Sequence, residues 1–199
     1  MTQAVLLDLG NVVLGVDFRL VFTRWAELAG VDEQRFYDRW EICPAYRAHE
    51  TGHMMFDEYC GVLSNRFGIE MPVEHWREGW NAIWTHPFEE VIKLLPKVAE
   101  HYHLCCFTNT NDTHAESWRG RFADRLQSFA TIYVSSEIGH RKPDVPAFEY
   151  VCGDMGIPPE QTLFLDDTLE NVAGARSAGL KAKQVRSEQE VVQALSTLL

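Results

Sequence analysis

Side chains that could transfer a phosphoryl group stand directly after short apolar runs of the sequence. They are a carboxylate at Asp8, a hydroxyl at Thr108, an amine at Lys142 and a carboxylate pair at Asp166 and Asp167. A carboxylate can attack phosphorus and form an aspartyl-phosphate, which divides one difficult displacement into two easier steps. The transferring group carries negative charge, so a lysine, a hydroxyl and the amides of a turn entering a helix would stabilise it. The residue types therefore predict phosphoryl transfer.

The same residues could hold a divalent cation. Mg²⁺ prefers oxygen ligands, one or two of them from carboxylates, with water and substrate phosphate completing the octahedron. Asp8 and Asp167 offer such ligands, whereas Asp166 could be either a direct ligand or a support behind one. Asn171 could orient this acidic loop, or cap a helix or face solvent. We therefore expect Mg²⁺ as the cofactor.

The apolar runs that precede these residues are short and apolar on both faces, which is typical of buried parallel strands. Helical signals alternate with them, including capping-box spacings at Thr113–Glu116 and Ser187–Glu190. The carboxyl ends of parallel strands meet at one edge of a sheet, where ligands bind in open α/β folds. The sequence thus predicts an α/β protein with a Rossmann-like parallel sheet core. The five expected strands are Ala4–Leu7, His103–Phe107, Ile132–Val134, Thr162–Leu165 and Lys181–Val185.

The segment from residue 17 to residue 85 has a different pattern, because it lacks strand-like runs and is dense in helical periodicity. Trp76, Trp80 and Trp84 recur every fourth residue, which predicts packing inside a bundle. We expect an inserted four-helix cap at 17–85 and a catalytic core made of 1–16 and 86–199. The four expected helices are Phe18–Ala29, Asp32–Trp40, Phe56–Phe67 and Val73–Trp84.

Composition restricts the partners. The net charge of −11 argues against nucleic acid, which would require clustered Lys and Arg. No apolar segment approaches the roughly 18 residues of a membrane helix, so no membrane partner is expected. A start without a basic leader and five cysteines without C-x-x-C spacing predict a cytoplasmic protein. The expected partner is a small phosphorylated metabolite; the oligomeric state stays open, because the aromatic residues of the cap fit its own core as well as a subunit contact.

Four motifs, in order along the chain, carry a resemblance to a known family. Asp8 stands in LLDLGNV, Thr108 in CCFTNTN, Lys142 in GHRKPD, and the acidic pair in LFLDDTLEN. The sequence resembles the haloacid dehalogenase (HAD) superfamily, in the branch with a helical cap after the first motif, and is most similar to bacterial sugar-phosphate phosphatases of the glucose-1-phosphate type. The resemblance implies a Mg²⁺-dependent aspartyl-phosphate mechanism on Asp8, with the backbone carbonyl of Gly10 as a further metal ligand. We also expect the backbone N–H of Asn109 to contact the phosphate.

One position departs from the family. Its phosphatases usually carry a second Asp two residues after the nucleophile, as the general acid and base, where this chain has Gly10. Losing such a group typically costs about 10²–10⁴-fold in rate. An anomeric phosphate has a relatively good leaving group and needs the acid less, so the expected substrate is a sugar phosphate such as an aldose 1-phosphate. Asp17 is the nearest other carboxylate, and it could replace the acid or cap the helix from Phe18.

Further polar residues could contact the substrate. His114 lies near the hydroxyl motif and is a candidate contact. Arg47, His49, Glu50 and His53 form a polar cluster in the cap that could face the core and select the sugar, or be a solvated helix connection.

Three other functions compete with a sugar-phosphate phosphatase. Carbon–halogen hydrolysis also uses an Asp nucleophile, but should not need the paired acids Asp166 and Asp167. A phosphomutase would have to return the phosphoryl group to a hydroxyl, which the loss of the acid-base Asp disfavours. A non-catalytic binder of phosphorylated metabolites would explain Gly10 as the trace of a lost activity.

Overall fold

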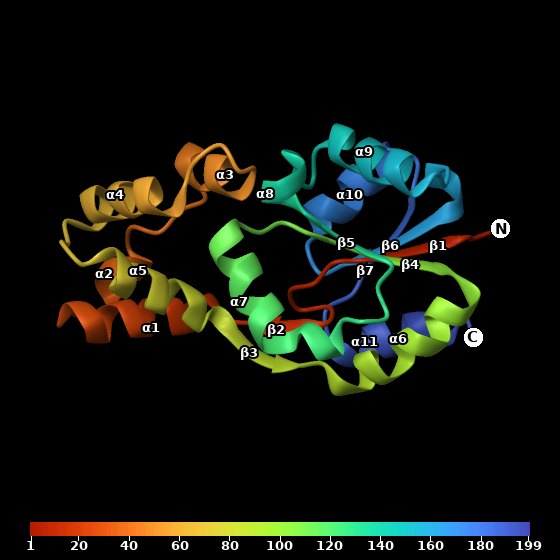
Figure 1. The fold of residues 1–199 in the computed structure, drawn as a ribbon, viewed down its shortest axis with the longest axis horizontal. Helices are drawn as coiled ribbons and strands as arrows, with labels where there is room; N and C mark the ends of the chain where they lie inside the picture. The colour runs from red at the N-terminus through yellow and green to blue at the C-terminus, as the bar shows by residue number, and fades with distance from the viewer.

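The five predicted strands form one parallel sheet in the computed structural model, which describes residues 1–199 (Figure 1). The strand order is β5-β4-β1-β6-β7, so β1 lies at the centre, between β4 and β6. The chain runs outward from β1 in both directions, which is the doubly wound arrangement of a Rossmann-like fold. The predicted α/β core is confirmed. Its strands are β1 (Ala4–Leu7), β4 (His103–Thr108), β5 (Thr131–Val134), β6 (Thr162–Asp166) and β7 (Lys181–Gln184).

Helices cover both faces of this sheet because its central strands are apolar on both sides. Successive side chains of a strand point to opposite faces. Val5 and Leu7 accordingly join the hydrophobic cluster that contains α6 and α11, whereas Leu6 packs in a second cluster with Phe148 of α9. Figure 1 shows α9 and α10 on one side of the sheet and α6 and α11 on the other. These helices are α6 (Glu89–His101), α9 (Val145–Met155), α10 (Leu169–Ser177) and α11 (Glu188–Ser196).

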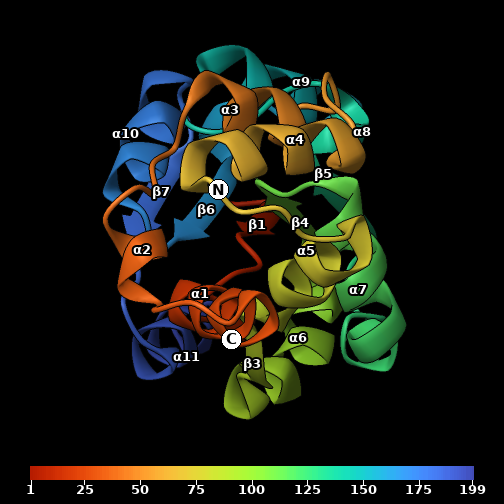
Figure 2. The ribbon, with the colours of Figure 1, turned by 90° about the vertical axis from the view of Figure 1, so that its left-hand side faces the viewer.

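The residues between β1 and α6 form a helical segment beside the sheet, with five α-helices rather than four (Figures 1 and 2). Two helices have the predicted limits, two are shorter than expected, and α3 was not predicted. Pro44 begins α3 at a position where its missing N–H costs nothing, a signal that the sequence did contain. The helices are α1 (Phe18–Ala29), α2 (Gln34–Tyr37), α3 (Pro44–Glu50), α4 (Phe56–Phe67) and α5 (Val73–Trp80).

The predicted helix Val73–Trp84 is wrong in its last turn. After α5 the chain makes a 3₁₀ turn at Asn81–Ile83 and then continues as β3 (Trp84–Pro87), which pairs antiparallel with β2 (Leu14–Val16). Trp84 therefore lies on a strand and leaves the predicted tryptophan stripe. The two strands stand where the chain enters and leaves the helical segment.

Aromatic packing fills the helical segment. Trp25, Trp76 and Trp80 are fully buried, and the rings of Trp25 and Trp80 stack at 5.6 Å. The indole N–H of Trp25 donates to the carbonyl oxygen of Trp76 at 2.9 Å. A Cβ at Gly79 would lie 2.1 Å from the Trp25 ring, so only glycine allows α1 and α5 to approach this closely. The prediction that Trp76 and Trp80 pack inside the bundle is confirmed.

The two predicted capping boxes differ in outcome. Ser187 caps α11, and its hydroxyl accepts the backbone N–H of Glu190. The helix near Thr113, α7 (Asp112–Phe122), is instead capped by Asn111, whose side chain accepts the N–H of His114 at 3.0 Å. Asparagine is at least as good an N-cap as threonine, and it stands two residues earlier. None of the helices combines the length and the apolar character that crossing a lipid bilayer requires.

Candidate active site

The central position of β1 places Asp8 between the ends of two neighbouring strands. The parallel register pairs Leu7 with Cys106 of β4 and with Leu165 of β6. Asp8 extends the ladder by one residue, and its N–H donates to the carbonyl oxygen of Leu165 at 2.9 Å. The last residues of the flanking strands, Thr108 and Asp166, are thereby brought to the same edge as Asp8, as the sequence predicted.

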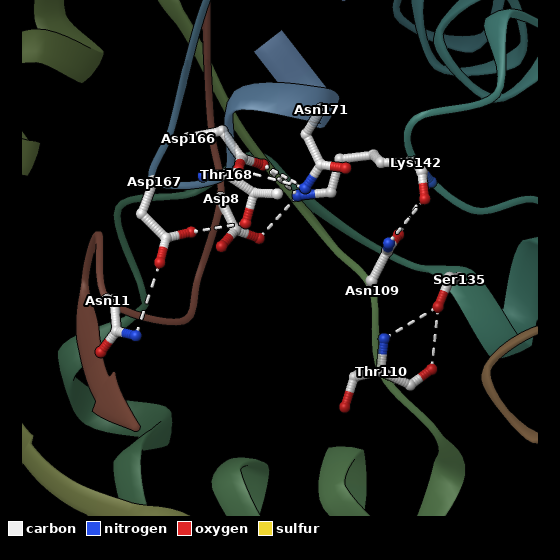
Figure 3. Close-up of polar contacts among 10 residues, drawn as sticks. All are labelled: Asp8, Asn11, Asn109, Thr110, Ser135, Lys142, Asp166, Asp167, Thr168 and Asn171. Carbon is white, nitrogen blue, oxygen red and sulfur yellow. Dashed lines mark hydrogen bonds and ion pairs between the residues drawn. The ribbon is translucent and has the colours of Figure 1, made fainter. Parts of the chain in front are cut away.

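Lys142 connects two of these carboxylates. Its Nζ lies 2.7 Å from Asp8 Oδ1 and 2.7 Å from Asp166 Oδ2, and the side chain is only 1% exposed (Figure 3). Burial lowers the pKa of this amine, but the two carboxylates outweigh burial and hold its pKa above the ordinary value. Lys142 is therefore a fixed positive charge beside the predicted nucleophile.

Asn109 holds the loop that carries Lys142. Its side-chain amide donates to the Lys142 carbonyl oxygen and accepts the Lys142 N–H, both at 2.8 Å (Figure 3). One residue further on, the hydroxyl of Ser135 accepts from the Thr110 N–H and donates to the Thr110 carbonyl oxygen. The turn after β4 is thus pinned to the lysine loop and to α8 (Ser135–Ile138).

The adjacent carboxylates Asp166 and Asp167 have different surroundings. Asp166 is fully buried, and besides Lys142 it accepts from the side chain of Asn171 at 3.1 Å and from the Thr168 N–H at 2.8 Å. Asp167 is half-buried and lines a cavity, which Asp166 does not. Both oxygens of Asp166 are therefore occupied by buried donors, whereas Asp167, which accepts from the Thr168 hydroxyl at 3.2 Å, presents its carboxylate to the cavity.

An oxygen of each of Asp8, Asp166 and Asp167 lies within 4.8 Å of the others. Burial raises the pKa of Asp8 to about 7, against the lowering effect of Lys142, and burial together with Asp166 raises the pKa of Asp167. Three carboxylates face one lysine, so the ionised cluster carries excess negative charge that a bound divalent cation would neutralise. Hard carboxylate oxygens in this arrangement fit Mg²⁺.

Asn11 belongs to the site and was not among the predicted residues. Its backbone is left-handed, with φ of 55°, a conformation that asparagine tolerates better than most residues. Its side chain accepts the Val16 N–H at 3.1 Å and lies 3.5 Å from Asp167 Oδ2 (Figure 3). The sequence signal that could have identified Asn11 was its place in the LGNV motif, directly after Gly10.

Gly10 lines the cavity, and the space around it does not require a glycine at this position. A Cβ there would meet Val16 at 3.4 Å and Asp8 Oδ2 at 3.9 Å, which are ordinary contacts. The missing carboxylate at this position is thus a chemical difference from the family pattern rather than a consequence of crowding.

The cavity has a volume of about 700 Å³ and lies between the strand ends and the helical segment. Asp8, Thr108 and Lys142 line its core side, and Tyr46, Arg47 and Glu50 of α3 line the opposite side. Glu50 forms a buried ion pair with Arg141, the residue before Lys142, at 2.8 Å. The sequence left open whether Arg47 and Glu50 face the core; the structure places both on the cavity wall. Of the other residues in that cluster, His49 is buried, and His53 is exposed.

The structure does not give Asp17 the place expected of a substrate contact. Asp17 caps α1, and its carboxylate forms a bidentate ion pair with Arg19, in which the shortest contact is 2.6 Å. It does not line the cavity. Of the two roles that the sequence allowed, helix capping is the one observed.

His114 lines the cavity, but its ring nitrogens are engaged elsewhere. Nε2 lies 2.9 Å from the Trp80 carbonyl oxygen, and Nδ1 lies 3.3 Å from the side-chain nitrogen of Asn111. Burial lowers its pKa to about 3, so the ring is neutral, with Nε2 the protonated nitrogen that donates to Trp80. His114 therefore joins α7 to α5, and only its ring surface is left for a ligand.

The arrangement is suited to attack on an electrophile by a carboxylate. Asp8 offers a nucleophilic oxygen, Lys142 a fixed cation, Thr108 a hydroxyl at the cavity wall, and Asp167 a carboxylate that a metal ion could reach. Fold and site together define a Rossmann-like α/β protein with a carboxylate cluster and a lysine at the end of its central strand.

Comparison with known proteins identifies the family. The model of the haloacid dehalogenase-like hydrolases matches residues 2–179, and the chain belongs to this family. D-ribitol-5-phosphate phosphatase of Bacteroides thetaiotaomicron is 22% identical, with 100% of this chain and 99% of that protein aligned. Drimenol cyclase of Aspergillus calidoustus is 28% identical over 100% of this chain, which matches 37% of that longer protein.

A solved structure supports the same fold. A haloacid dehalogenase family enzyme of Bacteroides thetaiotaomicron, in complex with magnesium and inorganic phosphate, superposes with a TM-score of 0.79 at 23% identity. The match covers 92% of this chain and 94% of that one.

Proposed function

We propose that the protein is a Mg²⁺-dependent phosphatase that hydrolyses a small phosphomonoester, a sugar or polyol phosphate, through an aspartyl-phosphate on Asp8. The observation that carries this proposal is the contact of Lys142 with both Asp8 and Asp166, each at 2.7 Å, at the edge where Asp167 is open to a metal ion. The phosphatase and the magnesium- and phosphate-bound structure among its relatives support it.

Each residue has a role in this proposal. Asp8 Oδ2 attacks phosphorus, because Oδ1 is held by Lys142. The P–O bond to the alcohol breaks, and water then attacks the aspartyl-phosphate, which releases inorganic phosphate and regenerates Asp8. Thr108 and the backbone N–H of Asn109 bind the phosphate oxygens, and Lys142 stabilises their charge. Asp8, the carbonyl of Gly10 and Asp167 would hold Mg²⁺, which would neutralise charge and orient the phosphate. Asp166 acts as a support, since its oxygens are bound by Lys142, Asn171 and Thr168.

The missing acid at Gly10 limits the leaving group. Neither His114, with both ring nitrogens engaged, nor Asp17, paired with Arg19, offers a proton in the cavity. We infer that the enzyme favours phosphates whose leaving group departs without strong protonation, of which an aldose 1-phosphate is an example.

We further propose that residues 17–85 act as a cap over the cavity, with the core formed by 1–16 and 86–199. α3 lies opposite the strand ends, with Tyr46, Arg47 and Glu50 at the cavity wall. The β2–β3 pair lies where the chain passes from the core into the helical segment and back. A cap in this position would exclude water and contact the part of the substrate beyond the phosphate.

A panel of phosphomonoesters, assayed with Mg²⁺ and with EDTA, tests the function. We expect Mg²⁺-dependent release of inorganic phosphate from at least one sugar or polyol phosphate, and its loss in Asp167→Asn. Absence of turnover for the whole panel would contradict a phosphatase and favour a non-catalytic binder. Release of halide from 2-haloacids without a metal ion would favour a dehalogenase, which the paired acids disfavour.

A further inference from the structure

The wall of the cavity opposite Asp8 contains a buried ion pair that the phosphoryl chemistry does not use. Arg141 Nε and Nη2 lie 3.0 Å and 2.8 Å from Glu50, and both donate to the same oxygen, Oε2. The Glu50 and Arg141 side chains are 5% and 11% exposed, and both line the cavity. The pair spans 91 positions of the sequence and joins α3 to the lysine loop.

A buried ion pair is weak evidence of stability, because the loss of hydration offsets most of the attraction. Both contacts end on Oε2, so Glu50 Oε1 and Arg141 Nη1 take no part in the pair. The Tyr46 hydroxyl lies beside the Glu50 carboxylate, and all three side chains line the cavity. A hydroxyl group both donates and accepts. Two neighbouring hydroxyls could therefore donate to Glu50 and accept from Arg141 at the same time.

The surrounding wall is suited to the same kind of ligand. Tyr46, one turn before Glu50 on α3, adds a phenol, while Phe18 and Trp84 offer aromatic surface for the C–H faces of a carbohydrate. A long apolar chain would instead cover the buried charges of Glu50 and Arg141 without offering hydrogen bonds, which is costly. The chemistry of the wall thus discriminates between polar and apolar alcohols.

We propose that Glu50 and Arg141 together bind neighbouring hydroxyls of the substrate, and that they select neutral polyhydroxylated alcohols, sugars or alditols, over apolar ones. The proposal rests on the phosphatase function, and it assigns the selection to one residue of the cap and one of the core. Glu50→Gln and Arg141→Lys alter the pair with little change in side-chain volume.

Binding to the Asp8→Asn protein tests the proposal without turnover. Calorimetry with D-ribitol 5-phosphate, D-glucose 1-phosphate and inorganic phosphate should show that one of the two polyhydroxylated phosphates binds more tightly than inorganic phosphate. Adding Glu50→Gln should weaken that ligand about tenfold, as expected for one hydrogen bond to a charged group, and leave inorganic phosphate within about twofold. Equal weakening of inorganic phosphate, no weakening of either ligand, or no advantage of the polyhydroxylated ligands would overturn it.

Steady-state kinetics provide a second readout on the active enzyme. Glu50→Gln and Arg141→Lys should raise KM for the preferred polyhydroxylated phosphate with little change in kcat, and leave kcat/KM for acetyl phosphate unchanged. A parallel loss with acetyl phosphate would show that the pair only positions Lys142 and would contradict the proposal. A higher kcat/KM for farnesyl monophosphate than for the polyhydroxylated phosphates would contradict it too.

A matched control is Glu78→Gln, which removes an exposed ion pair with Arg24 in the cap and does not touch the cavity. It should leave every constant unchanged. Thermal melting separates misfolding from selectivity, and where Glu50→Gln does not fold, Arg141→Lys, which keeps the charge, decides the question. If the wild type hydrolyses no phosphomonoester, the phosphatase function fails, and the calorimetric comparison still decides whether Glu50 binds hydroxyls.

Discussion

The side of the cavity formed by the strand ends, here the core side, and the side formed by the helical segment that we propose as a cap, here the cap side, are built in different ways. On the core side, three carboxylates at strand ends that sheet register brings together meet one lysine from the loop after α8, and the contact of Asp166 with Lys142 is fully buried. On the cap side, the polar groups come from the short helix α3, with one ion pair to the core and an exposed Arg47 that has no ion-pair partner.

This difference suggests a division of labour. The core side is rigid and fixed by backbone pairing, which suits a reaction that requires aligned charges. The cap side depends on side chains that can be exchanged without disturbing the sheet, which suits selection of the alcohol. Changes on the core side should therefore affect kcat and stability, and changes on the cap side should affect KM.

Among the substitutions that compare the two sides, Lys142→Ala should have the largest combined effect on stability and rate. The substitution leaves Asp8 and Asp166 buried without their cation, so unfolding free energy should fall by about 3–5 kcal/mol and kcat by about 10²–10³-fold. Denaturant unfolding and initial rates measure both. Lys93→Ala is the matched control, because it removes only the exposed contact with Glu90 and should change neither quantity. Unaltered stability of Lys142→Ala would show that the carboxylates do not need this charge.

Gly10→Asp should restore the acid that the family pattern contains. Since a side chain fits at this position, the new carboxyl group should raise kcat for D-ribitol 5-phosphate, whose leaving group is a poor one, by about tenfold or more. The gain for an aldose 1-phosphate should be smaller. Gly10→Asn has the same size without a titratable proton, and an equal gain there would contradict the explanation.

Mg²⁺ affinity should depend on pH through Asp8. Burial raises the pKa of this carboxyl to about 7 in the metal-free protein, and only its ionised form binds a cation. Proton and metal ion therefore compete below pH 7, so affinity should be about tenfold weaker at pH 6 than at pH 8, as one displaced proton requires. Calorimetric titration of Mg²⁺ at both values measures this. Equal affinity would show that Asp8 is not a ligand.

The smallest effect is expected where the cap rests on the core. Gly52 follows α3 with φ of 73°, and a Cβ there would lie 2.3 Å from the Ser136 carbonyl oxygen. Gly52→Ala should shift α3 and raise KM a few-fold, with kcat nearly unchanged. Gly30→Ala is the control. Gly30 has a φ of 66°, and nothing lies within 4 Å of an added Cβ, so this substitution strains the backbone without a steric clash. A fall in kcat without a change in KM would contradict the division between the two sides.

The sheet and the core side of the site could be predicted because their signals are local. Asp8, Thr108 and Asp166 each end or directly follow an apolar run, and a parallel sheet brings such ends together. The structure of the cap was harder to predict from the sequence. The pairing of β2 with β3 joins segments about 70 residues apart in the sequence, and a three-residue strand such as Leu14–Val16 has too little pattern to reveal its partner.

Partners of single side chains were harder still to predict. Nothing in the sequence indicates that Glu50 meets Arg141, because this contact joins segments that only the tertiary fold brings together. The opposite situations of Asp166 and Asp167 also follow from their neighbours, since the lysine and asparagine that bind Asp166 come from two other segments.

The central claim, that Asp8 carries the phosphoryl group, is tested most directly by trapping the intermediate. Rapid acid quenching during Mg²⁺-dependent turnover, followed by peptide mass spectrometry, should find one phosphoryl group on the peptide that contains Asp8, and none in Asp8→Asn. That variant should also have no measurable turnover, because an amide is a poor nucleophile. Turnover by Asp8→Asn, or a phosphoryl group on another residue, would contradict the account.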